Sequence, residues 1–215
     1  NYGGGAGRPR SGTSGAVGRG NARVELFDNT GAFTTSVTTA SDGSYSFGSL
    51  TTGTYHVRVV SDSVTSSRAG ATSALVPVLT FRTDATSGTV QPVTDFVGGI
   101  DPTTADAPRA LAGWTLDPVT GVFTGSGAGK AHAVSTVALG TAGIGDVDFG
   151  FNFNTVVNTN DAGQGSLRQA ITNANTLSAD ASLAQMSRTA AMEHVVFMLA
   201  NGTTGSGGKR NLTGG

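Results

Sequence analysis

Short stretches of alternating apolar and polar residues dominate the first sixty positions of the chain. Over 22–27 apolar side chains recur at every second residue, the period of a β-strand with one face on a core, and Phe33, Thr35 and Val37 continue the alternation. The pattern returns at 45–47 and at 55–60, and turn sequences rich in Asp, Asn and Gly separate the four segments. Four short strands at such close spacing predict a β-sandwich.

The pattern weakens over residues 61–145 and then sharpens. Residues 76–81 are a strand candidate, which Pro77 restricts to a sheet edge or a bulge. Over 146–154 every second side chain is apolar, and three of these side chains are aromatic. We therefore predict a strand over 146–154 that commits its aromatic face to a core.

The period changes from two to that of a helix after residue 165. Ser166 and Gln169 have the spacing of a capping box at a helix start. Apolar side chains follow at helical spacing and are expected to face inward: Leu167, Ala170, Ile171 and Ala174. The sequence thus predicts a short amphipathic helix over 166–177, a second helical stretch over 180–192 and a buried strand over 194–199.

The composition excludes several classes of protein. Of 215 residues, 33 are Gly and none is Cys, and 13% are charged, about half the usual fraction. A net charge of −1 gives no electrostatic footprint for nucleic acid or an anionic membrane. No apolar run is long enough for a transmembrane helix, and the lack of Cys excludes disulfide and thiolate chemistry. We expect no nucleic-acid partner and no membrane insertion.

Two motifs in the first sixty residues carry a family resemblance. Residues 42–47 read D-G-x-Y-x-F, and residues 50–57 read L-x-x-G-x-Y-x-V. With the strand and turn before them, they resemble the SdrD B-like, Cna B-type and carboxypeptidase-regulatory-like group. The resemblance implies a small Ig-like Greek-key sandwich that serves as a stalk or spacer in bacterial surface proteins. It gives no account of 61–145, which we interpret as an insertion before the closing strand.

The chain departs from this group at two kinds of site. Cna B-type domains often carry a Lys–Asn isopeptide bond whose Lys lies in an early strand, but residues 22–60 contain no Lys. Lys130 with Asn152 or Asn154 is the alternative pair. The calcium-binding Asp clusters of some SdrD B-like domains are also missing. Asp146 and Asp148, on one face of the predicted strand, are then the calcium candidates, or a carboxylate pair on a solvated strand face.

A second resemblance covers residues 156–175. Their sequence, V-V-N-T-N-D-A-G-Q-G-S-L-R-Q-A-I-T-N-A-N, is similar to a segment that opens a right-handed parallel β-helix in large secreted bacterial proteins. In those proteins the short helix caps the solenoid, and strands such as 194–200 begin its coils. A solenoid needs several coils to bury its faces, and this chain has room for about one. We expect Arg168 to bond Asp161 or nearby carbonyl groups.

The sequence predicts no catalytic site. The three His residues, His56, His132 and His194, lie far apart in sequence without a ligand pattern. The Gly-rich segment 125–131 lacks the first Gly of a phosphate loop and the Ser or Thr after its Lys. We therefore expect a protein that is not an enzyme and needs no cofactor, with calcium as the alternative.

Together these patterns predict a mainly β protein in three parts. Residues 1–20 form a flexible Gly-rich arm, and 21–154 form an Ig-like Greek-key β-sandwich with a long insertion at about 61–145. Residues 155–215 form a small α/β segment that resembles the N-terminal cap of a parallel β-helix.

The function expected from the sequence is structural. We predict an extracellular bacterial surface protein, a self-assembling fibre, stalk or matrix subunit whose partners are copies of itself or other surface proteins. Its two ends suit the addition of a strand to a neighbour's open sheet edge. The assembly candidates are Tyr2, Val195, Phe197 and Leu199. The alternatives are a fragment of a secreted β-helix enzyme acting on polysaccharide, and a carbohydrate-binding adhesin that uses Tyr2, Trp114 and Thr- or Asn-rich strand faces.

Overall fold

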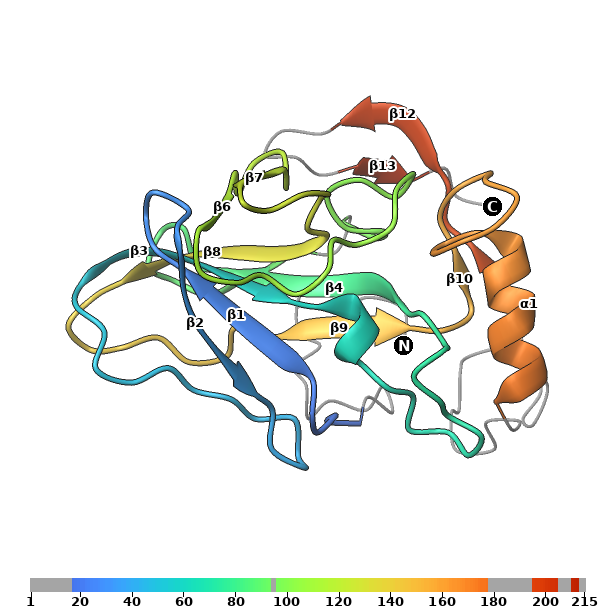
Figure 1. Cartoon of the computed structure of the whole chain (residues 1–215), viewed down its shortest axis with the longest axis horizontal. Coiled ribbons are helices and arrows are strands. Elements are labelled where there is room, and N and C mark those ends of the chain that lie inside the picture. The colour runs from blue at the N-terminus through green and yellow to red at the C-terminus, as the bar shows by residue number, and fades with distance from the viewer. Residues whose placement is uncertain (1–16, 94–95, 178–194, 205–209, 213–215) are drawn as a thin grey trace.

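The computed structural model describes residues 17–93, 96–177, 195–204 and 210–212 (Figure 1). The fold is mainly β, as the sequence predicted. Its largest sheet is antiparallel and has the strand order β2-β1-β3-β8. These strands are β1 (Arg23–Phe27), β2 (Phe33–Thr38), β3 (Gly53–Val59) and β8 (Ala133–Leu139).

A three-stranded sheet packs against one face of the large sheet. Its order is β5-β4-β9, from β4 (Val78–Asp84), β5 (Gln91–Val93) and β9 (Phe149–Asn152). A short 3-10 turn, η1 (Ser61–Ser63), follows β3. The core between the two sheets is apolar and includes Val24, Leu26, Val57, Val137, Leu79, Phe149 and Phe151. The two sheets therefore form a sandwich-like core.

The other face of the large sheet is also covered, which the alternating pattern did not predict. The covering segment, residues 101–131, contains the antiparallel hairpin of β6 (Trp114–Leu116) and β7 (Phe123–Gly125). Its apolar side chains form a second core with strand residues Phe27 and Val134: Ala107, Ala110, Leu116, Phe123 and Ala131. The strand predicted to be half-buried over 22–27 is thus buried on both faces.

Residues 61–145 are part of the sandwich, whereas we had expected an insertion. They supply β4, the middle strand of the smaller sheet, and β8, which pairs with β3 over its whole length. Pro77 lies just before β4, so it removes no ladder donor from this central strand. The alternating pattern is weak here because β4 and β8 are buried on both faces over most of their length.

Two predicted strands differ in the structure. Residues 45–47 form no strand; Tyr45 and Phe47 pack on the core from a loop instead, and the Tyr45 hydroxyl donates to the carbonyl of Val147 at 2.5 Å. The strand predicted over 146–154 is shorter, because Asp146 has a positive φ of 60° and β9 begins only at Phe149. Left-handed backbone is incompatible with a strand.

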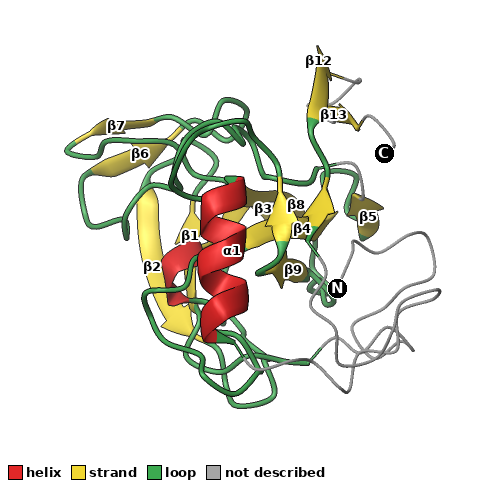
Figure 2. Ribbon diagram, turned by 90° about the vertical axis from the view of Figure 1, so that its right-hand side faces the viewer, coloured by secondary structure: helices red, strands yellow, loops and turns green. Residues whose placement is uncertain are grey.

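The chain continues into a small α/β part beside the sandwich (Figure 2). It contains β10 (Thr155–Val156), α1 (Leu167–Thr176), β11 (Val196–Phe197), β12 (Ala200–Thr204) and β13 (Arg210–Leu212). Strands β10 and β11 pair in parallel, and β12 and β13 pair antiparallel. No helix in the described part of the chain has the length and apolar character needed to span a membrane. The helix predicted over 180–192 lies outside the described residues.

Helix α1 begins as predicted and buries Ala170, but two of the apolar side chains predicted to face inward are exposed. Ser166 caps it by accepting from the backbone N–H of Gln169 at 3.1 Å, although the Gln169 side chain bonds Asn173 and does not complete the capping box. Asn173 is buried and donates to carbonyl groups of the sandwich, whereas Leu167 and Ile171 are 42% and 47% exposed. The predicted inward face of Leu167 and Ile171 is therefore wrong, because a buried Asn faces inward instead.

Candidate functional site

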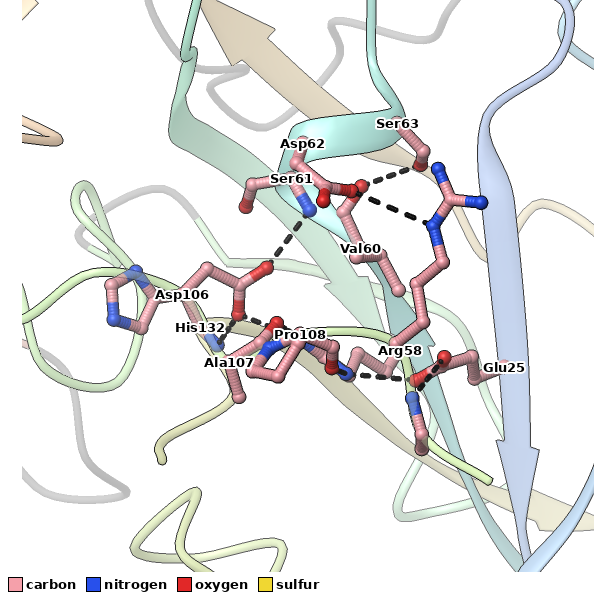
Figure 3. Close-up of polar contacts among 12 residues, drawn as sticks. Glu25, Arg58, Val60, Ser61, Asp62, Ser63, Asp106, Ala107, Pro108 and His132 are labelled. Atoms are coloured by element: carbon pink, nitrogen blue, oxygen red, sulfur yellow. Dashed lines mark hydrogen bonds and ion pairs between the residues drawn. The ribbon is translucent and has the colours of Figure 1, made fainter. Parts of the chain in front are cut away.

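A cluster of buried charges lies between the large sheet and the covering segment (Figure 3). The side chains of Arg58 on β3 and Glu25 on β1 are both fully buried, and Arg58 Nη1 lies 2.8 Å from Glu25 Oε2. Arg58 Nη2 lies 3.1 Å from Asp106 Oδ1, and the guanidinium also donates to the carbonyl groups of Ala107 and Pro108. Arg58 thus connects the centre of the sheet to residues 106–108.

Both carboxylates of the cluster are satisfied by further donors. Glu25 Oε1 accepts from Arg23 Nε at 2.9 Å and from the Ala110 N–H at 2.8 Å. Figure 3 shows the Asp106 carboxylate reaching the backbone N–H of Ser61 on one side and of His132 on the other, at 2.8 and 2.9 Å.

The cluster therefore holds the covering segment in place and leaves no carboxylate oxygen to act as an acid or a base. Buried charges persist only when paired in this way. Sequence reasoning missed the cluster, because Glu25 and Arg58 occupy the polar positions of two alternating strands. A signal was present: opposite charges stand in two strands that pair, and Glu25 lies directly opposite Arg58 in the register.

A pocket of about 300 Å³ opens on the other face of the large sheet. Its floor consists of buried side chains from three strands: Leu26, Val57 and Val137. Its walls are loop residues with half-buried apolar side chains, Tyr45, Phe47, Leu50, Ile144 and Val147. Its mouth is lined by exposed residues, including Ser44, Ser46 and Asp146. The pocket exists where loops, and not a further strand, cover the large sheet.

The calcium candidates Asp146 and Asp148 both line this pocket. Their main chains are fixed by Thr83, whose hydroxyl donates to the Asp146 carbonyl at 2.8 Å. Within the described residues, no group of three or more His, Cys, Asp or Glu side chains could hold a metal ion. Burial and the negative charge of Asp148 raise the pKa of Tyr45, so its hydroxyl stays a neutral donor.

The outer edge of β2 is open over residues 35–38 in the part of the chain that the structure describes. Thr39 donates its N–H to the carbonyl of Ala22 at 2.9 Å, and the same register places Val37 opposite Val24. Because hydrogen-bonded pairs alternate in an antiparallel ladder, Thr35 and Val37 bond to β1. The N–H and C=O groups of Ser36 and Thr38 therefore point away from the sheet.

The beginning of β2 is closed. The register shifts near Phe27, so that Thr34 is an extra residue at a β-bulge. Ala32 forms a bridge with Thr115 of β6, and Leu116 donates its N–H to the Gly31 carbonyl at 2.8 Å. The open edge is thus a short, regular segment that follows the bulge.

The predicted assembly residues near the C-terminus lie on and beside β11. Val195 and Leu199 are half-buried and Phe197 is 53% exposed, whereas Tyr2 lies outside the described residues. Strand β11 pairs with β10, so this segment has a strand partner within the chain. Met198 also packs against a small buried cluster of Val78, Val97 and Val157.

The His residues and the aromatic candidate have structural contacts. His56 Nδ1 lies 3.1 Å from the Thr136 hydroxyl, and His132 Nε2 lies 3.3 Å from the Thr104 hydroxyl. His194 lies outside the described residues. Trp114 packs edge-on against Phe123, with ring centroids 5.0 Å apart, as expected of a packing anchor.

Two predicted polar contacts have distinct outcomes. Arg168 bonds the carbonyl and the carboxylate of Asp161, which confirms the prediction. Lys130 Nζ lies 2.6 Å from Asp101 Oδ2. Burial alone would raise the pKa of Asp101, but hydrogen bonds from Lys130 and Thr103 outweigh it and lower the pKa to about 2. Lys130 thus pairs with Asp101 rather than with Asn152 or Asn154, the partners proposed for an isopeptide bond.

Comparison of the chain with protein-family models, curated protein sequences and solved structures finds no match. The geometry of the described residues thus carries the functional argument. Among the described residues, two features have no evident role in holding the fold together: the open edge of β2 and the pocket on the sandwich side of the large sheet.

Proposed function

We propose that the chain is an extracellular bacterial structural protein, a self-assembling fibre, stalk or matrix subunit whose copies join by strand pairing at β2. The observation that carries the proposal is the open edge at residues 35–38. Its outward backbone groups, on Ser36 and Thr38, are a ready template for a strand from a second copy.

The side chains of this edge do not discourage pairing. Soluble proteins usually protect an open edge with Lys, Pro or an inward-pointing charge. From Phe33 to Ala40 the sequence is F-T-T-S-V-T-T-A, without a charged residue or a proline. Thr, Val and Phe are residues that favour strands. A neighbouring strand could therefore pair here without removing an ion from water.

The extracellular assignment rests on the two sequence resemblances and on composition. Both resemblances, at 20–59 and 156–175, are to surface or secreted bacterial proteins, and the chain has no Cys to be oxidised outside the cell. We also propose, from the same resemblance, that the sandwich is of the Ig-like Greek-key type. A structural role also agrees with a buried ion cluster that stabilises the fold and offers no reactive group.

The parallel pair of β10 and β11 favours a second candidate function, a secreted β-helix protein acting on polysaccharide. These strands flank α1 in sequence and would begin such a solenoid. Release of reducing sugar from bacterial or plant polysaccharides by the full-length gene product would support this candidate. A complete lack of release, with assembly present, would favour the structural role.

The test of the structural role is a proline at the open edge. Ser36→Pro removes an outward N–H while leaving the ladder to β1 intact, and Ser36→Thr is the matched control. We expect the unmodified chain and Ser36→Thr to assemble with rising concentration in analytical ultracentrifugation and negative-stain microscopy. We expect Ser36→Pro to stay monomeric with an unchanged circular dichroism spectrum. Assembly of Ser36→Pro equal to that of the unmodified chain would refute the role of this edge, and a strictly monomeric unmodified chain would refute the function.

A further inference from the structure

We propose that the pocket on the sandwich side of the large sheet receives residues 1–16 of a second copy of the chain, the part of the predicted arm 1–20 that precedes the described residues; this part is called the arm below. This inference rests on the proposed function and names the segment that copies exchange. The pocket, at about 300 Å³, is large enough for one or two side chains of a peptide segment. Exchange of identical segments between copies is a low-cost route to assembly.

The chemistry of the pocket matches the arm. The floor and walls are apolar, the mouth carries the exposed Asp146, and the half-buried Asp148 also lines the pocket. Among the residues that the structure describes, no Lys, Arg or His lines it. The arm contains Arg8 and Arg10, no acidic residue and a single aromatic residue, Tyr2. An aromatic side chain can fill the apolar interior while arginines meet the carboxylates at the mouth.

The arm also begins beside the pocket. Gly18 lies against the loop that contributes Gly43 to the lining, so closely that a side chain at Gly18 would meet the Asp42 carbonyl oxygen at 1.7 Å. Gly43 has a φ of 85°, and a side chain there would lie 2.8 Å from the Gly18 Cα. These two glycines therefore fix the start of the arm at the rim of its own pocket.

From this start the arm can reach a neighbour. A fully extended chain spans 3.3–3.6 Å per residue, which gives residues 1–16 a reach of about 50 Å. That reach exceeds the width of a small domain. A copy paired at β2 would lie within it, because neighbouring strands are only about 4.8 Å apart.

Engineered cysteines test the proposal cleanly because the chain contains no Cys. One full-length chain carries Asn1→Cys, which leaves Tyr2 intact, and a second carries Ser46→Cys at the pocket mouth. Ala128→Cys, at an exposed site in the covering segment, replaces Ser46→Cys as the matched control. Under mild oxidation we expect severalfold more disulfide-linked heterodimer from the Asn1 and Ser46 pair than from the Asn1 and Ala128 pair. Equal yields would overturn the proposal.

Charge variants of the arm provide a second readout. Arg8→Gln combined with Arg10→Gln should lower the heterodimer yield severalfold, whereas Lys at both positions should retain it. If the Gln variants link as well as the parent, the carboxylates at the mouth do not recognise the arm and the proposal fails.

The outcomes separate this proposal from the proposed function. If copies assemble in a manner sensitive to Ser36→Pro but the Asn1 and Ser46 cysteines do not link between chains, the arm proposal alone fails. If the cysteines link only within a single chain that carries both, the arm closes its own pocket and the exchange is overturned. If they link between chains but Ser36→Pro has no effect, the arm joins the copies and the β2 edge does not.

Discussion

The two edges of the large sheet differ in how the rest of the chain treats them. At the β8 edge, Ala85 donates its N–H to the Thr136 carbonyl at 2.9 Å and accepts from the Ala138 N–H at 3.0 Å. Ser135 and the carbonyl of Val134 are bonded there by Thr83 and Arg82. At the β2 edge, the described part of the chain places no strand beside residues 35–38.

This difference does not come from composition. Strand β8 reads A-V-S-T-V-A-L and β2 reads F-T-T-S-V-T, so both are uncharged and rich in strand-forming residues. The β8 edge is closed because β4 arrives beside it from a distant part of the sequence. The comparison teaches that a sheet edge is available for association only where the rest of the fold leaves it uncovered. Substitutions at the covered β8 edge should therefore change the stability of the monomer, and substitutions at the open β2 edge should change association.

The largest effect is expected where the closed part of the sheet depends on buried charge. Arg58→Met would leave Asp106 buried without its cation and Glu25 with Arg23 alone, and should lower the free energy of unfolding by about 3–5 kcal/mol. Arg109→Met is the matched control, because Arg109 is exposed and lies 3.9 Å from an exposed Asp62. Urea unfolding of both variants measures the difference. A loss below about 1 kcal/mol for Arg58→Met would contradict the structural role of the cluster.

A smaller loss of unfolding free energy is expected when a proline is placed at the β8 edge, and a smaller one still when it is placed at the β2 edge. Ala85→Pro removes the donor to the Thr136 carbonyl and should lower the unfolding free energy of the monomer by about 1–3 kcal/mol. Ser36→Pro should change monomer stability by about 0.5 kcal/mol or less, since it removes no internal hydrogen bond. Denaturant unfolding at a concentration below assembly compares them. Equal losses would mean that the β2 edge is bonded within the monomer.

Local pattern predicted the parts of the fold that depend on neighbours in sequence. The strands predicted over 22–27, 33–37 and 55–60 correspond to β1, β2 and β3 within two residues. The Ser166 cap and the contact of Arg168 with Asp161 also follow from short spacings. The alternating pattern does not predict which strands pair when they lie far apart in sequence. The segment that forms β8 was therefore assigned to an insertion. Whether D-G-x-Y-x-F becomes a strand also depends on a partner, and in this chain Tyr45 and Phe47 pack from a loop.

The candidate site was only partly predictable for the same reason. Asp146 and Asp148 were identified as a carboxylate pair, but the pocket beside them forms from residues of three strands and two loops. The alternation that marks Glu25 and Arg58 as polar positions predicts a face of the sheet and not its burial. Only the arrival of Asp106 and its loop turns that face into a second core.

Residue-resolved hydrogen exchange tests the central claim, that copies join at the open β2 edge, most directly. The amides of Ser36 and Thr38 should exchange rapidly in dilute monomer and become strongly protected on assembly. The amides of Thr35 and Val37, which bond to β1, should be protected in both states and serve as internal controls. Equally rapid exchange of Ser36 and Thr38 in the assembled material would contradict strand pairing at β2.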